Sequence, residues 1–476
     1  MPPSQGSPSR SAPPRAKTLF LYALMLAASF GAFLWIRSRG EELTALAGST
    51  TLATPAAQAP EHVLLHVLLS LLVVILAARA LGAVFRYIGQ PPVIGEVVAG
   101  ILLGPSLLGR ILPEAQAFLL PIGIAPELGV IAQVGVILFM FLIGLELDTS
   151  LLGKHSHATL AISHSSIVGP FLSGAVLALW LYPVLSSSDV GFTNFALFMG
   201  VSMSVTAFPV LARILTDRGL SRSKLGVIAL ACAAVDDVTA WCLLAAIVGI
   251  VRANATNSLW TLALTLVYLV GMVVVVRPII GRLARRESSN QRLTQGATAA
   301  ALIGLLASAL ITEAIGIHAL FGAFLLGAII PHDSLLAKQL LERLEDFVVV
   351  LLLPAFFAFT GLRTQIGLLG TVMDWVYCGC IVLVACAGKF GGSTLAARLT
   401  GLSWREASAL GVLMNTRGLM ELIVLHVGLD LGVISPRLFA MLVVMAVVTT
   451  LATSPLLQLL KPGVGLTPLS AAAGRG

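Results

Sequence analysis

Two adjacent aspartates, Asp236 and Asp237, stand at the centre of an apolar stretch that runs from 223 to 251. A charge at membrane depth costs at least about 2.5–3.5 kcal/mol, so such acids need a function or a partner. Neighbouring residues on a helix point about 100° apart, because 3.6 residues complete a turn. We therefore expect one carboxylate to meet a counter-charge and the other to face a water-filled cavity. The doublet predicts a site for a proton or a cation.

Three further charged residues lie within apolar stretches and could compensate the aspartates. Lys389 lies deep in the stretch 373–397, too far from its ends to reach water easily, and it is the natural partner of one aspartate. Arg417 and Glu421 are four residues apart, a spacing at which side chains meet on one helix face. We interpret this second pair as structural charge neutralisation.

Two apolar stretches are predicted to be broken near the middle of the membrane. The marking residues are Thr206 and Pro209 in the stretch 193–215, and Asn415, Thr416 and Gly418 in the stretch 405–429. Proline removes a backbone donor and clashes with the preceding turn. Irregular backbone at membrane depth is tolerated only where it lines a cavity or is buried in protein, so matched breaks predict a binding site. A kink that only shapes helix packing is the alternative for Pro209.

Composition places these residues in a membrane protein. The chain has 476 residues, 58% of them apolar and 11% charged, whereas soluble domains average about 25% charged residues. This excludes a soluble enzyme and predicts an all-α polytopic membrane protein embedded in a lipid bilayer. The formal charge of +7 then reflects Lys and Arg held in cytoplasmic loops, so we expect no nucleic-acid partner.

Fourteen stretches satisfy the requirement of about 20 mostly apolar residues for a membrane helix, a few of them only with interruptions. They are 18–36, 61–84, 91–108, 127–147, 158–183, 193–215, 223–251, 258–279, 294–314, 316–331, 346–362, 373–397, 405–429 and 436–460. From the second stretch onward, seventeen Lys and Arg fall on one side of this topology and four on the other. The richer side is predicted to be cytoplasmic, which places both termini in the cytoplasm.

These stretches divide the chain into five parts. We expect 1–17 and 461–476 to be cytoplasmic tails, the first of them disordered. Residues 18–36 are predicted to form a membrane anchor, with a cleaved signal peptide as the alternative. Residues 37–60 then form an extracytoplasmic linker, and 61–460 form the transmembrane domain.

Three pairs of segments resemble each other in the same order along the chain. They are 95–108 with 322–336, 139–152 with 356–369, and 235–240 with 448–453. Any single pair could be chance, but together they indicate repeats over about 91–251 and 316–460. The second copy begins seven stretches after the first, and because seven is odd the copies have opposite orientations. Inverted repeats are typical of secondary transporters, which bind substrate near the membrane midplane.

These residues together resemble the monovalent cation:proton antiporter superfamily. The most similar branch includes glutathione-gated potassium efflux systems, plant cation/proton exchangers and bacterial sodium/proton antiporters. The matching segments are 206–213, 235–238, 316–324, 356–363 and 415–422. The resemblance covers about 61–460 and implies an inverted-repeat sodium/proton antiporter fold with two crossing broken helices. That fold has a 13-helix core with a dimerisation domain and a mobile ion-carrying domain, to which this chain adds one N-terminal helix.

The resemblance also implies roles for individual residues. It makes Asp237 the ion-binding carboxylate, with Asp236 beside it and Lys389 as the basic residue of the pair. We expect Asp237, Asp236 and Thr206 to bind the ion or the proton, and the only metal, at Asp237, would be the transported Na⁺ or K⁺ rather than a cofactor. The resemblance further implies a homodimer in the bacterial inner membrane.

The predicted function is secondary active exchange of a monovalent cation, Na⁺ or K⁺, for protons by alternating access. Proton and cation would compete for Asp237. If Asp236 and Lys389 exchange their salt bridge for a proton in each cycle, two protons could move per cation. The alternative is a proton-uncoupled monovalent cation channel or gated efflux pore. An enzyme is not expected, since an intramembrane aspartyl protease needs two aspartates that face one water.

Overall fold

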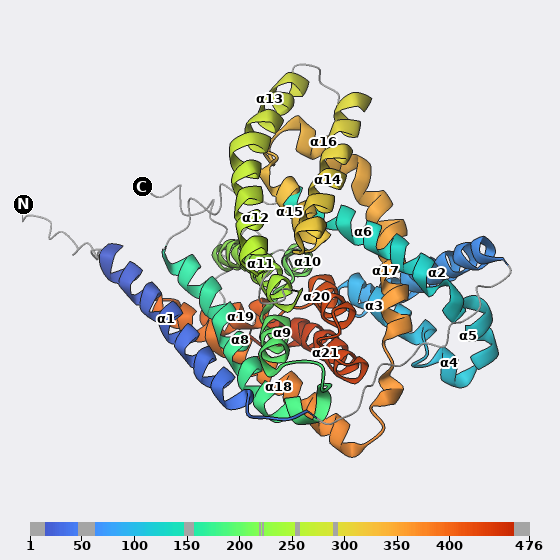
Figure 1. Ribbon diagram of the computed structural model, residues 1–476, viewed down its shortest axis with the longest axis horizontal. Coiled ribbons are helices and arrows are strands. Elements are labelled where there is room, and N and C mark those ends of the chain that lie inside the picture. The colour runs from blue at the N-terminus through green and yellow to red at the C-terminus, as the bar shows by residue number, and fades with distance from the viewer. Residues whose placement is uncertain are drawn as a thin grey trace, which may run out of the picture.

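The structure is a computed structural model that describes residues 15–45, 62–146, 157–218, 220, 223–252, 258–288 and 294–460. Within these ranges the regular elements are helices, and there is no strand (Figure 1). The predicted tail 461–476, and most of the predicted tail 1–17 and linker 37–60, lie outside the described residues. The predicted fold class, an all-α polytopic membrane protein, is confirmed.

The helices follow one another with short connections. They are α1 (Arg15–Gly40), α2 (Val63–Tyr87), α3 (Pro92–Leu103), α4 (Leu108–Ile111), α5 (Pro113–Leu119), η1 (Ile122–Ile124), α6 (Ala125–Glu146), α8 (His157–Leu185), α9 (Phe192–Ser204), α10 (Phe208–Asp217), α11 (Lys224–Arg252), α12 (Ser258–Gly271), η2 (Met272–Val276), α13 (Arg277–Ser288), α14 (Gln295–Ile315), α15 (Ala319–Ile329), α16 (Leu335–Phe347), η3 (Val348–Leu352), α17 (Leu353–Arg363), η4 (Ile366–Leu368), α18 (Val372–Leu399), α19 (Trp404–Met414), α20 (Leu419–Asp430) and α21 (Pro436–Leu460). Each of the fourteen predicted stretches coincides with one helix or with consecutive helices.

Eleven spans of the described part are long and apolar enough to cross a membrane, and the pair α19 and α20 makes a twelfth. Two predicted stretches fall outside this set. One forms α15, which has only 11 residues, and the other forms α1. Residues 15–40 are helical in α1, so the helix predicted over 18–36 extends further at both ends.

The helices form two bundles that lie side by side (Figure 1). The α6 bundle consists of α2, α3, α6, α14, α15 and α17. The α8 bundle consists of α1, α8, α9, α10, α11, α18, α19, α20 and α21. The helices α12 and α13, joined by the π-helical turn η2, connect α11 of one bundle to α14 of the other.

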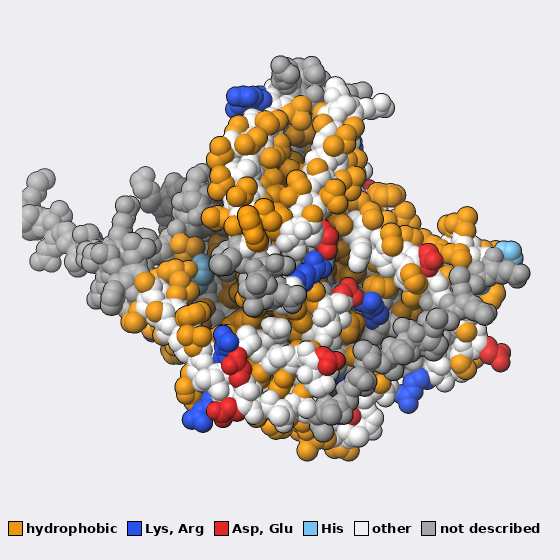
Figure 2. Space-filling model, viewed as in Figure 1, with side chains coloured by type: hydrophobic (Ala, Val, Ile, Leu, Met, Phe, Trp, Pro, Cys, Tyr) orange, Lys and Arg blue, Asp and Glu red, His pale blue; other side chains and the backbone are white. Residues whose placement is uncertain are grey.

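Apolar side chains cover the projecting part formed by α12, η2, α13 and α14 (Figure 2). Among them, Val270 and Val273 on one side and Ile303 and Leu306 on the other are more than half exposed. An apolar surface of this kind marks contact with lipid or with another protein, in agreement with a chain that lies in a membrane.

Pairs of glycines allow close packing inside the α6 bundle, and the pairs reflect the sequence repeat. Gly100 of α3 lies against the backbone at Gly361 of α17, and Gly144 of α6 lies against the backbone at Gly327 of α15. In the aligned repeats, Gly100 corresponds to Gly327 and Gly144 to Gly361. Each contact therefore joins one repeat to the other, and exchanging the repeats turns one contact into the other. This is the relation that a two-fold axis between the repeats requires.

The first broken helix changes direction before its proline. Helix α9 ends at Ser204, residues 205–207 are extended, and α10 begins at Phe208. Pro209 occupies the first turn of α10, where a missing N–H costs nothing and the fixed φ suits a helix start. Pro209 thus begins a second half-helix, and the helix is interrupted before it by residues 205–207.

The second broken helix consists of α19 and α20, which are bent by 47° at residues 415–418. The two breaks touch through their backbones, since the Ala207 N–H donates to the Thr416 carbonyl at 3.1 Å. Gly418 faces the same crossing, where a Cβ would meet the side chain of Val210 on α10. The broken helices therefore cross inside the α8 bundle with almost no side-chain bulk between them.

The glycine packing gives a stability prediction. In Gly100→Ala the added Cβ meets the Phe357 carbonyl, which cannot move alone because it belongs to α17. We expect a loss of about 1–3 kcal/mol, typical of overpacking, seen as a lower midpoint of thermal unfolding in detergent. Gly379→Ala on α18 is the matched control, because nothing lies within 4 Å of its Cβ. Equal midpoints of thermal unfolding for Gly100→Ala and Gly379→Ala would contradict the close approach of α3 to α17.

Candidate functional site

Asp236 is held by four donors, which come from two other helices and from the break between α9 and α10. It is fully buried on α11 and accepts from Ser163 at 2.6 Å, from Ser166, and from Thr206 at 2.7 Å. Lys389 of α18 is 3.5 Å from the same carboxylate. Buried charges are stable when they are both paired and hydrogen-bonded, and Asp236 meets both conditions.

Asp237, the next residue, has a different environment. It is 2% exposed, and the backbone of Phe208 lies near enough to interact with its carboxyl group. Its Oδ1 atom has no hydrogen-bond partner among the described residues. Phe208 begins α10, so Asp237 lies at a helix amino end, where unpaired N–H groups and the helix dipole favour an anion.

Two cations cap the carboxyl end of α9. Lys389 donates to the Ser204 carbonyl, while Arg417 donates to the Ser202 carbonyl at 2.9 Å and the Met203 carbonyl at 2.7 Å. The last carbonyls of a helix have no partner within it, and a cation there also interacts favourably with the helix dipole. Both side chains are fully buried, so the broken backbone and the buried charges satisfy one another.

The amino end of α20 carries the complementary acid. Glu421 lies in the first turn of α20 and is 3.0 Å from Arg417, so the i,i+4 pair expected from the sequence is present. The backbone N–H of Arg417 donates to the Thr450 hydroxyl at 3.0 Å. Thr450 aligns with Asp237 in the repeats, and each contacts the backbone of the break in its own half. The first repeat therefore places a carboxylate, that of Asp237, at the crossing. The second repeat places a hydroxyl, that of Thr450, at the corresponding position.

The other predicted residues of the second break stabilise its ends. Thr416 donates its hydroxyl to the Leu413 carbonyl at the end of α19. Asn415 donates its amide to the sulfur of Cys386 at 3.4 Å, and its Oδ1 has no partner among the described residues. The Thr416 bond is a helix-end contact, whereas the Asn415 amide reaches the middle of α18.

A cavity of about 320 Å³, which we call the Pro209 cavity, reaches the crossing from one side. Its lining includes Ala207, Pro209 and Leu419 of the crossing and many apolar side chains. It also includes six charged side chains: Arg79, Arg86, Glu96, Glu146, Arg213 and Glu345. Asp237 does not line it, contrary to the expectation that one aspartate faces a water-filled cavity. Because Ala207 and Pro209 flank Phe208, the cavity ends one residue from the backbone group that interacts with Asp237.

A second cavity of about 440 Å³, the Asp430 cavity, lies between the bundles on the opposite side. Its charged and polar lining consists of Gln133, Arg252, Glu313, His318, Arg363, His426 and Asp430. Glu345 of the Pro209 cavity and Arg363 of the Asp430 cavity belong to the single span Leu335–Leu368. Eighteen helical residues separate them, or about 27 Å at 1.5 Å per residue. The cavities therefore approach the crossing from opposite ends of the spans.

Sequence reasoning missed the serines that hold Asp236. Ser163 and Ser166 are three residues apart on α8, and both are fully buried. Their spacing places them on one helix face, which was the available signal. Hydroxyls in apolar helices usually bond to their own backbone, so a serine pair alone does not indicate a partner.

The crossing of two broken helices beside buried carboxylates defines a class. Discontinuous helices that meet at the interface of inverted repeats, near the middle of the membrane, are the architecture of secondary transporters. Residues 67–459 match the family model described as sodium/hydrogen exchanger, transmembrane. The chain belongs to this family, and the resemblance predicted from its motifs is confirmed.

Individual relatives support the same assignment. The chain is 45% identical over 403 residues to the Na(+)/H(+) antiporter NhaS4 of Synechocystis sp., an alignment that covers 84% of this chain and 98% of the relative. It is 39% identical over 405 residues to Cation/H(+) antiporter 20 of Arabidopsis thaliana and 36% identical over 400 residues to K(+)/H(+) antiporter 1 of Saccharomyces cerevisiae. Each alignment covers 82% of this chain but only 48% and 46% of the relative. The chain thus spans about half the length of these plant and yeast relatives.

A solved structure shows the same fold. The sodium proton antiporter MjNhaP1 from Methanocaldococcus jannaschii, determined at pH 8, superposes with a TM-score of 0.57. The superposition covers 83% of this chain and 98% of that chain at 14% sequence identity. The likeness therefore concerns the arrangement of the helices.

The capping of α9 gives a second stability prediction. Arg417→Met leaves Glu421 buried without its partner and removes two caps, so we expect a loss of about 3–5 kcal/mol, typical of breaking a buried pair. The double variant Arg417→Met/Glu421→Gln should recover part of that loss, because it leaves no unpaired charge. Thermal unfolding midpoints in detergent, measured as a double-mutant cycle, check this. Additive losses would show that the pair is not coupled.

Proposed function

We propose that the chain exchanges a monovalent cation, Na⁺ or K⁺, for protons across the membrane by alternating access, with Asp237 as the shared binding group. The observation that carries this proposal is the buried Asp237 oxygen that has no partner among the described residues. It lies at the amino end of α10, where two broken helices cross. Family membership and the names of the relatives support the same activity.

The difference between the two aspartates supports this division of roles. Asp236 accepts from three hydroxyls and pairs with Lys389, so its oxygens are largely occupied. Asp237 offers an oxygen that a proton or a cation can take. A bare carboxylate is costly in a low-dielectric interior, so the α8 bundle moves readily only with Asp237 protonated or loaded. That restriction couples the movement of the proton to the movement of the cation.

The ligands near Asp237 suit a hard monovalent cation. The described residues hold no group of three or more His, Cys, Asp or Glu that could bind a metal ion, so further ligands would be hydroxyl and carbonyl oxygens. Such oxygens suit hard cations. The relatives include a protein named for Na⁺ and one named for K⁺, so both ions belong in the test.

The two cavities support alternating access. The Pro209 cavity reaches the crossing, whereas two ion pairs join the bundles beside the Asp430 cavity. These are Arg252 of α11 with Glu313 of α14 at 3.1 Å, and Arg363 of α17 with Asp430 of α20. In the orientation given by the Lys and Arg distribution, the open side is cytoplasmic and the paired side extracytoplasmic. We propose that this conformation faces inward.

Other parts of the sequence prediction extend this proposal. A bacterial inner-membrane location with both termini in the cytoplasm, a role in pH homeostasis, and a homodimer stay predictions. So does the transfer of two protons per cation through an exchange of the Asp236–Lys389 pair for a proton.

Asp237→Asn tests the proposed function. The amide keeps the size of the carboxyl group but cannot bind a proton and release it in exchange for a cation. We expect proton flux driven by Na⁺ or K⁺ in reconstituted vesicles to fall to the level of empty vesicles, while thermal stability is retained. Flux assays with a pH-sensitive dye, with and without a clamped membrane potential, also report the coupling.

Ser202→Ala is the matched control, because among the described residues the Ser202 hydroxyl bonds to its own helix at Met199, and the backbone carbonyl of residue 202 remains to bind Arg417. It should keep exchange near the wild-type rate. Normal exchange by Asp237→Asn would refute the assignment. Cation flux in the wild type without counter-moving protons would instead identify the channel alternative.

The ion pairs between bundles give a prediction on the closed side. Exposed pairs contribute about 0–1 kcal/mol each, so Arg363→Gln should shift the equilibrium a few-fold toward the state that opens the Asp430 cavity. Hydrogen exchange of peptides from the end of α20 should then increase. Arg437→Gln is the matched control, because Arg437 pairs with Asp374 inside the α8 bundle and should leave α20 unchanged. Equal effects of both variants would contradict a role for the Arg363 pair in closure.

A further inference from the structure

Helix α1 touches the rest of the protein along one narrow stripe. Its partly or fully covered residues recur every three or four positions: Tyr22, Met25, Ser29, the neighbours Ala32 and Phe33, Ile36 and Gly40. Between them, Leu24, Leu26, Phe30 and Leu34 are exposed. This periodicity marks a single helix face, so α1 has a defined docking side. The family match begins only at residue 67, so α1 is an addition to the shared fold.

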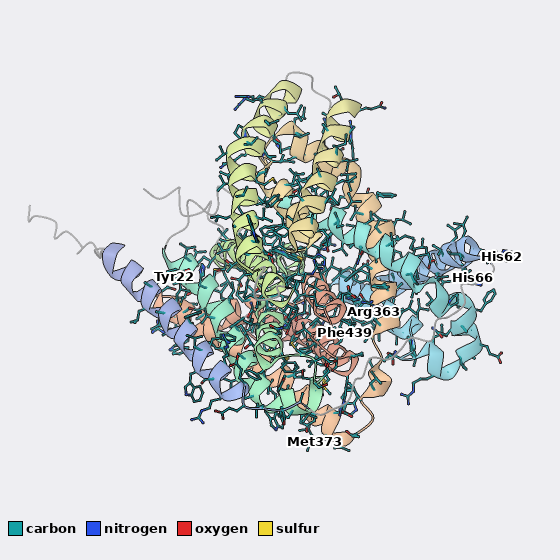
Figure 3. All side chains as sticks on the ribbon, viewed as in Figure 1. Tyr22, His62, His66, Arg363, Met373 and Phe439 are labelled. Carbon is teal, nitrogen blue, oxygen red and sulfur yellow. The ribbon has the colours of Figure 1, made fainter. Side chains whose placement is uncertain are left out.

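The docking side of α1 lies on α8 (Figure 1). Tyr22, labelled in Figure 3, meets the ring of His164 edge-on, with 5.1 Å between ring centroids. The Ser165 hydroxyl lies 3.8 Å from the sulfur of Met25. Further along, Phe33 contacts Phe171, with centroids 5.7 Å apart.

The end of α1 is fixed to α9. Gly40 lies directly against the ring of Phe192, in the first turn of α9. Glu41 accepts from Arg37 at 2.7 Å and from Thr193 at 3.0 Å. These hydrogen bonds, that of Arg37 first, lower the pKa of Glu41 and keep its carboxylate charged. α1 is therefore held at both ends, across two helices that build the ion site.

The turn of α8 beneath Tyr22 and Met25 is the turn that binds Asp236. His164 and Ser165 face α1, while Ser163 and Ser166 donate to Asp236. Residues i and i+3 share a helix face, and the two residues between them point elsewhere. A single turn thus connects α1 to the buried carboxylate.

An adjoining side of α8 is closed by α18, the helix that carries Lys389. Gly392 lies against the Ser165 carbonyl, and Gly169 lies against the backbone at Gly388. With no side chain between them, α8 and α18 are in backbone contact. The α8 turn can move away from Asp236 only toward α1, and there Tyr22 and Met25 occupy the space.

We propose that α1 is a positioning helix for the ion site, and that Tyr22 and Met25 hold the Ser163–Ser166 turn against Asp236. The inference rests on the proposed function, because the quantity it changes is the apparent affinity for the exchanged cation. Without the Tyr22 contact the turn moves outward and Asp236 loses hydroxyl donors. The interaction of Asp236 with Lys389 then changes. The competition between the proton and the cation for the neighbouring Asp237 changes as a result.

The test compares two aromatic truncations on the same helix in the full chain, reconstituted in vesicles. Tyr22→Ala should raise the Na⁺ or K⁺ concentration for half-maximal proton flux several-fold and shift the pH profile, with maximal flux per folded protein retained. Tyr22→Phe keeps the ring contact and should restore the wild-type value. Phe33→Ala removes a similar ring from the same docking side, but its partner Phe171 lies beyond the serine turn, so its half-maximal concentration should equal the wild type.

Two results would overturn the proposal. The first is an unchanged half-maximal concentration in Tyr22→Ala, which would also follow if α1 were removed from the mature protein. The second is an equal shift in Tyr22→Ala and Phe33→Ala, which would mean general loosening. If the wild type shows no cation-driven proton flux, the proposed function fails instead. Hydrogen exchange of the α8 peptide around 157–170 can then still be compared in the two variants. Faster exchange in Tyr22→Ala but not in Phe33→Ala would show that Tyr22 holds this turn.

Discussion

The broken backbone of α9 at membrane depth is the constraint from which the site follows. Its last carbonyls cannot reach water, and an unsatisfied backbone group in hydrocarbon costs several kcal/mol. Lys389 and Arg417 supply the missing donors. Two buried cations then require anions, and Asp236 and Glu421 provide them. The helix ends and charges of the crossing thus depend on one another, while Nε of Arg417 and Oε1 of Glu421 have no hydrogen-bond partner among the described residues.

Within this set Asp237 differs from its neighbours. The inverted repeat places Thr450 where the first repeat has Asp237, and each residue contacts the backbone of its own break. A hydroxyl can satisfy that backbone group without charge. The carboxylate is therefore more than the fold needs at this position, and our proposal assigns the proton or the cation to its oxygen that has no partner among the described residues.

The sequence predicted the helices and most of the site because a membrane makes both conspicuous. Long apolar runs mark the spans, and charges within them, such as Lys389, are rare enough to be found by inspection. It could not decide which aspartate pairs with Lys389, since adjacent acids on one helix look alike until the helix is rotated into place. Nor could it find Ser163, because a hydroxyl in an apolar helix usually bonds to its own backbone. The docking side of α1 depends equally on tertiary packing.

The division between the bundles explains why so few residues act in the proposed cycle. In the α6 bundle, glycine pairs such as Gly100 with Gly361 join the repeats through backbone contacts, which resist sliding. The α8 bundle contains the five charged residues of the crossing and carries α1 on its outer side, so in the proposed cycle it would move with its site intact. The changing contacts are then those between bundles, namely the linings of the two cavities and the pairs of Arg252 and Arg363. Because these pairs are exposed and individually weak, they can bias the equilibrium between the two openings without locking it, as rapid exchange requires.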